Sequence, residues 1–149
     1  MKTLKKLTKE NTEEMITLFR SVFTAEPWKD DWSDENQLRL YINDLTGNNN
    51  SLTYGLYEDG ELVGLSMGYV MHWYMATEYY IIELCIRTDK QGKGLGTYFF
   101  DEMEKELLAN DIKQIYLQTE ENVPAYEFYK KRGFFVLNGH MSLGKNIDG

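Results

Sequence analysis

Cysteine, histidine and basic charge are all scarce in this chain of 149 residues. Its one cysteine, Cys85, excludes a disulfide within the chain and suits a reducing compartment, so we expect a cytoplasmic location. No Cys/His cluster indicates a metal site, because the two histidines lie far apart. The 16 basic residues are outnumbered by 24 acidic ones, giving a net charge of −8. This balance argues against a nucleic-acid partner and is compatible with an amine substrate.

Long hydrophobic runs are also missing. The sequence contains no run of about 18 consecutive apolar residues, the length that predicts a membrane-spanning helix, so we expect no membrane partner. The Lys-rich residues 1–10 carry no apolar core of a signal peptide. The chain is nevertheless 42% hydrophobic, which is enough to bury a globular core, and we expect a single domain over residues 1–149.

The periodicity of apolar residues changes along the chain between that of helices and that of strands. The predicted elements, in order, are a strand 2–7, a helix from Asn11 or Thr12 to Pro27, a helix from Ser33 to Gly47, strands 52–58, 61–74 and 77–87, a helix 94–110, a strand 112–119, a helix 123–132, and closing strands 134–137 and 141–143. The order β-α-α-β-β-β-α-β-α-β-β predicts an α/β (α+β) fold: a mixed sheet of about seven strands flanked by four helices.

A glycine-rich turn, Gln91-Gly92-Lys93-Gly94-Leu95-Gly96, joins a predicted strand to a predicted helix. A helix N-terminus presents unpaired N–H groups and a positive dipole, and glycines let an anion approach that backbone closely. The turn therefore predicts a phosphate or pyrophosphate ligand, or else serves only as a flexible connection. It is neither a Walker P-loop nor the G-x-G-x-x-G dinucleotide fingerprint.

The Q-x-x-G-x-G spacing resembles the acetyl-CoA signature of the GNAT superfamily of N-acetyltransferases. A second segment, from Asn122 through Tyr129 to Gly133-Phe134, is similar to that superfamily's fourth motif. Both occur in the order that the family requires, and the resemblance is clearest over residues 61–137. It implies a GNAT-like fold, acetyl-CoA as acetyl donor, no metal, and compatibility with a homodimer.

The resemblance also implies a set of residues that hold acetyl-CoA. In the family, main-chain N–H groups of a central strand bind the pantetheine arm and polarise the thioester carbonyl. The implied donor-binding residues are Leu84, Cys85, Ile86, Gln91, Gly92, Lys93, Gly94, Leu95, Gly96, Thr97, Asn122 and Tyr126.

Glu83 is a carboxylate inside an otherwise apolar predicted strand, 77–87. Burying a charge is costly unless it is paired or functional. Its place resembles that of the acidic residue of aminoglycoside 6′-N-acetyltransferases, which implies that Glu83 orients or deprotonates the acceptor amine. The alternative is a carboxylate that faces solvent or pairs with a nearby cation.

Tyr129 resembles the family's general acid, which protonates the departing thiolate of the coenzyme. A tyrosine pKa near ~10 is compatible with that role. The alternative is a core tyrosine on an amphipathic helix. We expect Cys85 to be a buried, inert thiol despite sharing a strand face with Glu83.

The resemblance also implies that the segment 26–35, which combines two tryptophans with five carboxylates, forms a wall of the acceptor pocket. Carboxylates and aromatic rings suit a cationic amine, so Trp28, Asp31 and Trp32 are candidate substrate-binding residues. The alternative is a solvated acidic loop anchored by its tryptophans. His72 is a further candidate for substrate contact, or else a packed histidine.

Taken together, these features predict acetyl transfer to a primary amine of a small cationic acceptor such as an aminoglycoside or polyamine. Other hypotheses stay open: an acetyl-CoA-binding sensor without catalysis, an enzyme acting on a protein lysine or N-terminal amine, and one acting on a hydroxyl or using another acyl donor.

Overall fold

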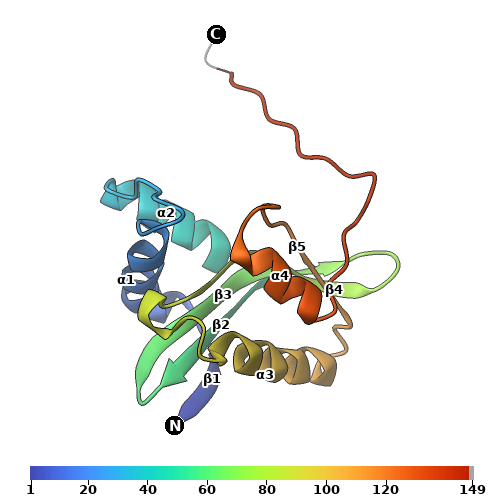
Figure 1. Cartoon of the computed structure of the whole chain (residues 1–149), viewed down its shortest axis with the longest axis horizontal. Coiled ribbons are helices and arrows are strands. Elements are labelled where there is room, and N and C mark those ends of the chain that lie inside the picture. Colours follow the sequence, from blue (N-terminus) through green and yellow to red (C-terminus); the bar gives the residue numbers. More distant parts are fainter. Residues whose placement is uncertain (148–149) are drawn as a thin grey trace. The chain divides into compact units, whose positions relative to one another are not determined.

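One sheet of five strands forms the centre of the first part of the chain (Figure 1). The computed structural model describes residues 1–147, which divide into two units, Met1–Gln118 and the residues from Thr119 onward. The strands are β1 (Lys2–Lys6), β2 (Ser51–Glu58), β3 (Glu61–His72), β4 (Thr77–Ile86) and β5 (Gln114–Leu117). They lie in chain order across the sheet, antiparallel from β1 to β4, and β5 runs parallel to β4.

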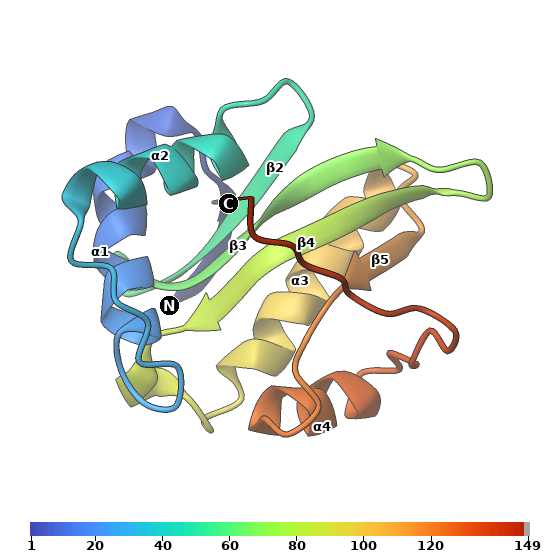
Figure 2. The ribbon, with the colours of Figure 1, turned by 90° about the horizontal axis from the view of Figure 1, so that it is seen from above.

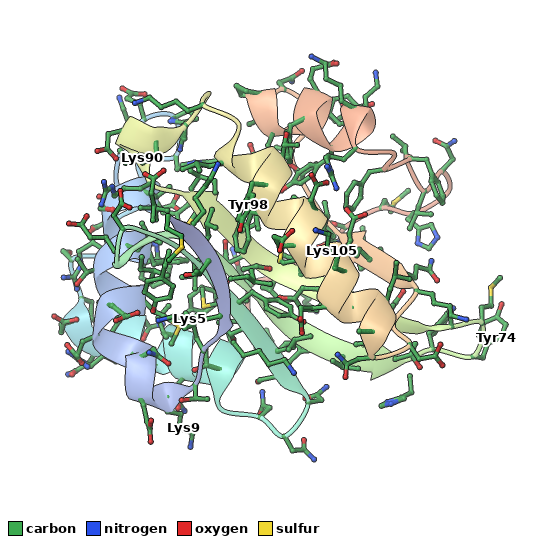
Figure 3. The ribbon with its side chains drawn as sticks, turned by 90° about the horizontal axis from the view of Figure 1, so that it is seen from below. Lys5, Lys9, Tyr74, Lys90, Tyr98 and Lys105 are labelled. Atoms are coloured by element: carbon green, nitrogen blue, oxygen red, sulfur yellow. The ribbon has the colours of Figure 1, made fainter. Side chains whose placement is uncertain are left out.

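Helices α1 (Thr12–Phe23) and α2 (Glu35–Thr46) lie on one face of this sheet, and α3 (Leu95–Ala109) lies on the other (Figures 1 and 2). The apolar side chains of α1 recur at helical spacing and all face the core. They pack with α2 and with Met67 and Cys85 of the sheet. Figure 3 shows α3 crossing the opposite face, where the Tyr98 hydroxyl donates to the Lys2 carbonyl at 3.1 Å.

Strand β4 contains a bulge beside Glu83. Met67 of β3 lies opposite Glu83, whereas the next residue, Gly68, lies opposite Ile81, so Ile82 is the extra residue. A side chain at Gly68 would place its Cβ 2.0 Å from the Tyr80 carbonyl oxygen, which explains the glycine. The bulge shifts the alternation of side chains, which turns Glu83 toward the α1–α2 face.

Beyond the bulge, β4 continues without a partner on its β5 side. The parallel pairing with β5 ends at Ile81 and Leu117, and no strand of residues 1–118 pairs with β4 after that point (Figure 2). Arg87 donates its N–H to Val63 of β3 at 2.7 Å. Because strand backbone groups alternate in direction, Leu84 and Ile86 direct theirs toward the open edge.

The second unit contains the helix α4 (Pro124–Lys131). Pro124 stands in its first turn, where a missing N–H costs nothing. Gly133, at a φ of 94°, ends the helix, and the Phe134 N–H bonds the Tyr129 carbonyl at 3.0 Å.

Some predicted boundaries were wrong. The sheet has five strands in place of about seven, since residues 134–147 form no strand although Phe135 and Leu143 are apolar. A turn with a positive φ forms at Gly139, but a hairpin that lacks further strands is marginally stable by itself. Helix α1 ends at Phe23, before Pro27, and the N-cap of α2 is Asp34 rather than Ser33.

Candidate active site

Glu83 is partly buried, and one of its oxygens is held by a tyrosine of α2. The Tyr41 hydroxyl donates to Glu83 Oε2 at 2.5 Å. Within residues 1–147, Oε1 of Glu83 has no hydrogen-bond partner. One carboxylate oxygen is thus fixed and the other can accept a proton or bind an ammonium group.

Three effects set the proton affinity of Glu83. Burial raises the pKa of this carboxyl, the Tyr41 hydrogen bond opposes the rise, and the negative charge of Asp30 adds to it. The net pKa lies above the ordinary value, which makes Glu83 a stronger base than a solvated carboxylate. Such a shift is common where a carboxylate takes up a proton in a reaction.

An aromatic cluster surrounds Tyr41. The Trp32 ring stacks on it with centroids 5.4 Å apart and planes inclined by 16°. Phe19 of α1 meets both rings edge-on, at 5.9 Å from Tyr41 and 5.5 Å from Trp32. Trp28 packs separately against Phe23 at 5.8 Å. Both tryptophans of segment 26–35 are therefore anchored in the core while remaining partly accessible.

The five carboxylates of segment 26–35 are not equivalent. Glu26 pairs with Lys29, Glu35 pairs with Arg20, and Asp34 caps α2 through the Gln37 N–H. Asp31 accepts the Ser33 N–H at 3.1 Å, and hydrogen bonds from Ser33 hold the pKa of Asp31 below its usual range. Asp30 is exposed and makes no side-chain hydrogen bond or ion pair within the described residues. A depression of about 490 Å³ runs over this segment, and Asp30, Asp31, Trp32 and Glu35 are among its lining residues.

The glycine turn leads directly into the N-terminus of α3. Gly94 is the N-cap at a φ of 81°, and no side chain caps the helix. A side chain at Gly92 or Gly94 would meet no atom within 4 Å, so the backbone there faces open space. The first N–H groups of α3, which belong to Leu95, Gly96 and Thr97, are the ones that a helix leaves unpaired. Lys93 is exposed beside them.

Gln91 links this turn to the open edge of β4. Its side-chain Nε2 donates to the Ile86 carbonyl at 2.9 Å. This contact confirms that the Ile86 backbone faces the open edge. The unpaired strand edge and the uncapped helix N-terminus therefore adjoin, and Gln91 has a structural task that its place in the signature does not reveal.

Cys85 lies beside Glu83 on β4 but is unreactive, and His72 lies well away from Glu83 on β3. Cys85 is buried, and burial, with the charge of Glu83, raises the pKa of its thiol well above the usual range. Such a thiol is a poor nucleophile. His72 is exposed at the end of β3, five residues along the strand from the partner of Glu83, which corresponds to roughly 16 Å.

Asn122, Tyr126 and Tyr129 belong to the second unit. Tyr129 is buried on α4, and its ring lies 5.3 Å from that of Phe134. Tyr126 is partly buried under Lys130, whose ammonium lies 5.2 Å from the ring centroid. Asn122 is exposed in the turn before α4. Their roles stay predictions.

Two important residues were missed by sequence reasoning. Tyr41 lies within the predicted helix from Ser33 to Gly47 and was not singled out, although a tyrosine hydroxyl at a buried position usually finds a hydrogen-bond partner. Gly68 was also overlooked. A glycine inside a predicted strand indicates a bulge or a close approach of another backbone, and this was the only signal that the sequence offered.

The chain belongs to the Acetyltransferase (GNAT) family, whose family model matches residues 12–134. That match includes β4, the glycine turn and α4. No curated protein matches the chain significantly in sequence.

Solved structures of acetyltransferases have the same fold. An aminoglycoside acetyltransferase from an uncultured soil metagenomic sample, in complex with sisomicin, aligns with a TM-score of 0.76 at 16% identity, over 99% of this chain and 97% of that one. A possible acetyltransferase from Clostridium difficile 630 aligns with a TM-score of 0.81 at 14% identity, over 99% of both chains. AAC(6′)-Iy, in complex with a bisubstrate analogue, aligns with a TM-score of 0.75 at 10% identity, over 98% and 99%.

Within the described residues, no group of three or more His, Cys, Asp or Glu side chains is arranged to hold a metal ion. The helices of the same residues are all too short or too polar to cross a bilayer.

Proposed function

We propose that this chain transfers the acetyl group of acetyl-CoA to a primary amine of a small cationic acceptor. The observation that carries the proposal is the carboxylate of Glu83, of which one oxygen accepts a hydrogen bond from Tyr41 and the other has no partner within residues 1–147. Glu83 lies on β4 at the point where the strand edge becomes unpaired. The proposal is supported by the family and by the uncapped N-terminus of α3 that follows. We also propose a cytoplasmic location, because the thiol of Cys85 is free and such thiols are typical of reducing compartments.

The residues of the first unit fit the donor as follows. The N–H groups of α3 and the charge of Lys93 bind the pyrophosphate. The open backbone groups of Leu84 and the N–H of Ile86 pair with the amides of the pantetheine arm, as an added strand would. An N–H group at this edge also polarises the thioester carbonyl.

Glu83 acts on the acceptor. It takes a proton from the ammonium group, and the free amine then forms a bond to the thioester carbonyl carbon. The carbon–sulfur bond breaks, and the thiolate receives the second proton of the nitrogen, with Tyr129 proposed as the acid that delivers it. The products are an amide, the thiol form of the coenzyme, and one proton that Glu83 returns to solvent.

A cationic acceptor is favoured by Asp30, whose charge has no partner within the described residues and whose field reaches Glu83. With Trp32 nearby, the segment offers a carboxylate and a ring to an additional ammonium group. Aminoglycosides and polyamines both carry several amines within reach of such an arrangement.

Release of coenzyme thiol should be measured with acetyl-CoA and a panel of monoamines, polyamines, aminoglycosides and lysine peptides. We expect turnover with acceptors that carry two or more ammonium groups and weaker turnover with monoamines. Turnover with lysine peptides alone would assign a protein substrate. Binding of acetyl-CoA without turnover on any amine would make the chain a sensor and overturn the proposal.

A further inference from the structure

The hydrogen bond between Tyr41 and Glu83 joins α2 to the middle of β4. It places Oε2 of Glu83 at 2.5 Å from the Tyr41 hydroxyl and leaves Oε1 without a partner within residues 1–147. We propose that Tyr41 is a positioning residue that holds Glu83 with Oε1 directed to the acceptor amine. This inference rests on the proposed function.

Tyr41 is itself held firmly enough for this task. Its ring is stacked on Trp32 and touched edge-on by Phe19, which fix the direction of the hydroxyl. Burial, the bond to Glu83 and neighbouring negative charge raise the pKa of Tyr41 far above the neutral range. The hydroxyl therefore remains a proton donor at every pH at which the enzyme would work.

The contact also links acceptor binding to the base. Trp32 belongs to the acidic segment 26–35, and its ring rests on the tyrosine that holds Glu83. An acceptor that contacts Trp32 thus meets a carboxylate whose position is set by the same stack. Small errors in such placement are costly, since misplacement by about 1 Å reduces rates by roughly 10²-fold.

Few charged or titratable groups act on Glu83. Tyr41 acts on the pKa of Glu83 from α2, and Asp30 acts on it from the segment before α2. Glu83 in turn acts on Cys85 of the same strand, while Tyr69 and Asp44 act on Tyr41. Of these, only the Tyr41 hydrogen bond lowers the pKa of Glu83. Its removal leaves burial and Asp30, which both raise the pKa, so the acidic limb of the pH profile should move to higher pH.

The variant Tyr41→Phe keeps the ring and removes only the hydroxyl. We expect kcat/KM for a diamine to fall by about 10–10²-fold at pH 7, with the KM for acetyl-CoA unchanged. The acidic limb of the pH profile of kcat/KM should move to higher pH. Tyr57→Phe is the matched control, because it removes another tyrosine–glutamate hydrogen bond between sheet and helix, that of Tyr57 with Glu14, away from Glu83. This control should keep the wild-type rate and profile.

A double-mutant cycle separates positioning from a general loss of structure. In the Glu83→Gln background, Tyr41→Phe should cause little further loss, whereas two independent defects would multiply. Carboxyl ¹³C NMR provides a readout without turnover: the pKa of Glu83 should be higher in Tyr41→Phe than in the wild type, and an unchanged pKa overturns the inference.

The two proposals fail in distinguishable ways. No turnover by the wild type on any amine overturns both. Wild-type turnover together with a Tyr41→Phe variant that matches Tyr57→Phe in rate and pH profile overturns the role of Tyr41 alone.

Discussion

Asp30 is the carboxylate of segment 26–35 that is free to meet a substrate, because its neighbours pair, cap a helix or bond Ser33. We expect Asp30→Asn to raise the KM of a diamine acceptor about two- to fivefold with kcat unchanged, the scale of an exposed ion pair. Steady-state kinetics with the control Glu10→Gln, which removes one charge on η1 (Lys9–Asn11), checks this. Equal KM values for the two variants would remove Asp30 from the acceptor site.

Glu83 should reduce the stability of the fold at neutral pH. Its folded-state pKa lies above the ordinary value of 4.5, so between the two values the folded chain binds more protons than the unfolded chain. Stability attributable to Glu83 is then greatest below pH 4.5 and is lost as pH rises through the folded-state pKa.

We therefore expect Glu83→Gln to be more stable than the wild type near pH ~7 and to converge with it below pH ~4.5. Urea unfolding at a series of pH values measures the difference. A Glu83→Gln variant that is less stable than the wild type at neutral pH would contradict this prediction, because it would mean that the charged carboxylate stabilises the fold. Residues of this kind illustrate how a site gives up stability for reactivity.

At the scale of elements, the bulge of β4 determines which way Glu83 points. Gly68→Ala would force a Cβ against the Tyr80 carbonyl and should cost about 1–3 kcal/mol of unfolding free energy. Because the pairing must shift to relieve this contact, acetyl transfer should fall more than the loss of folded protein explains. Gly144→Ala, where a Cβ meets no atom within 4 Å, is the control. Wild-type activity in folded Gly68→Ala would show that catalysis does not depend on the geometry of the bulge.

The sequence was sufficient for most elements, because their signals are local. The apolar positions of α1, the Asp59-Gly60 turn and the glycine turn before α3 are each visible within a few residues. The bulge at Ile82 and the contact of Tyr41 with Glu83 were not, because each joins residues that are distant in the chain. The prediction of closing strands at 134–137 and 141–143 was wrong for a related reason. Apolar residues supply strand propensity, whereas a strand also needs a partner edge.

For the molecule as a whole, binding of acetyl-CoA should stabilise the folded state. At a concentration about 100 times its Kd, a ligand selective for the native chain adds about 2.7 kcal/mol, which corresponds to roughly 5–10 °C in Tm for this size. Gly94→Asp should abolish the shift, because it adds a negative charge at the N-terminus of α3. Differential scanning fluorimetry measures both.

Gly139→Asp is the matched control for this experiment. Gly139 has a φ of 89°, close to the 81° of Gly94, and a Cβ added at either glycine would meet no atom within 4 Å. The backbone strain is thus comparable, while the charge lies in the second unit. Equal stabilisation of both variants by acetyl-CoA would place the pyrophosphate elsewhere.

The central claim is that Glu83 removes the proton of the acceptor amine. The most direct measurement is kcat/KM for a diamine between about pH 6 and pH 10, in the wild type and in Glu83→Gln. We predict a loss of about 10–10³-fold at pH 7 that shrinks as pH rises, because the free amine becomes abundant and needs the base less. A loss that is equal at every pH would contradict the account, since it would leave Glu83 no role in proton transfer.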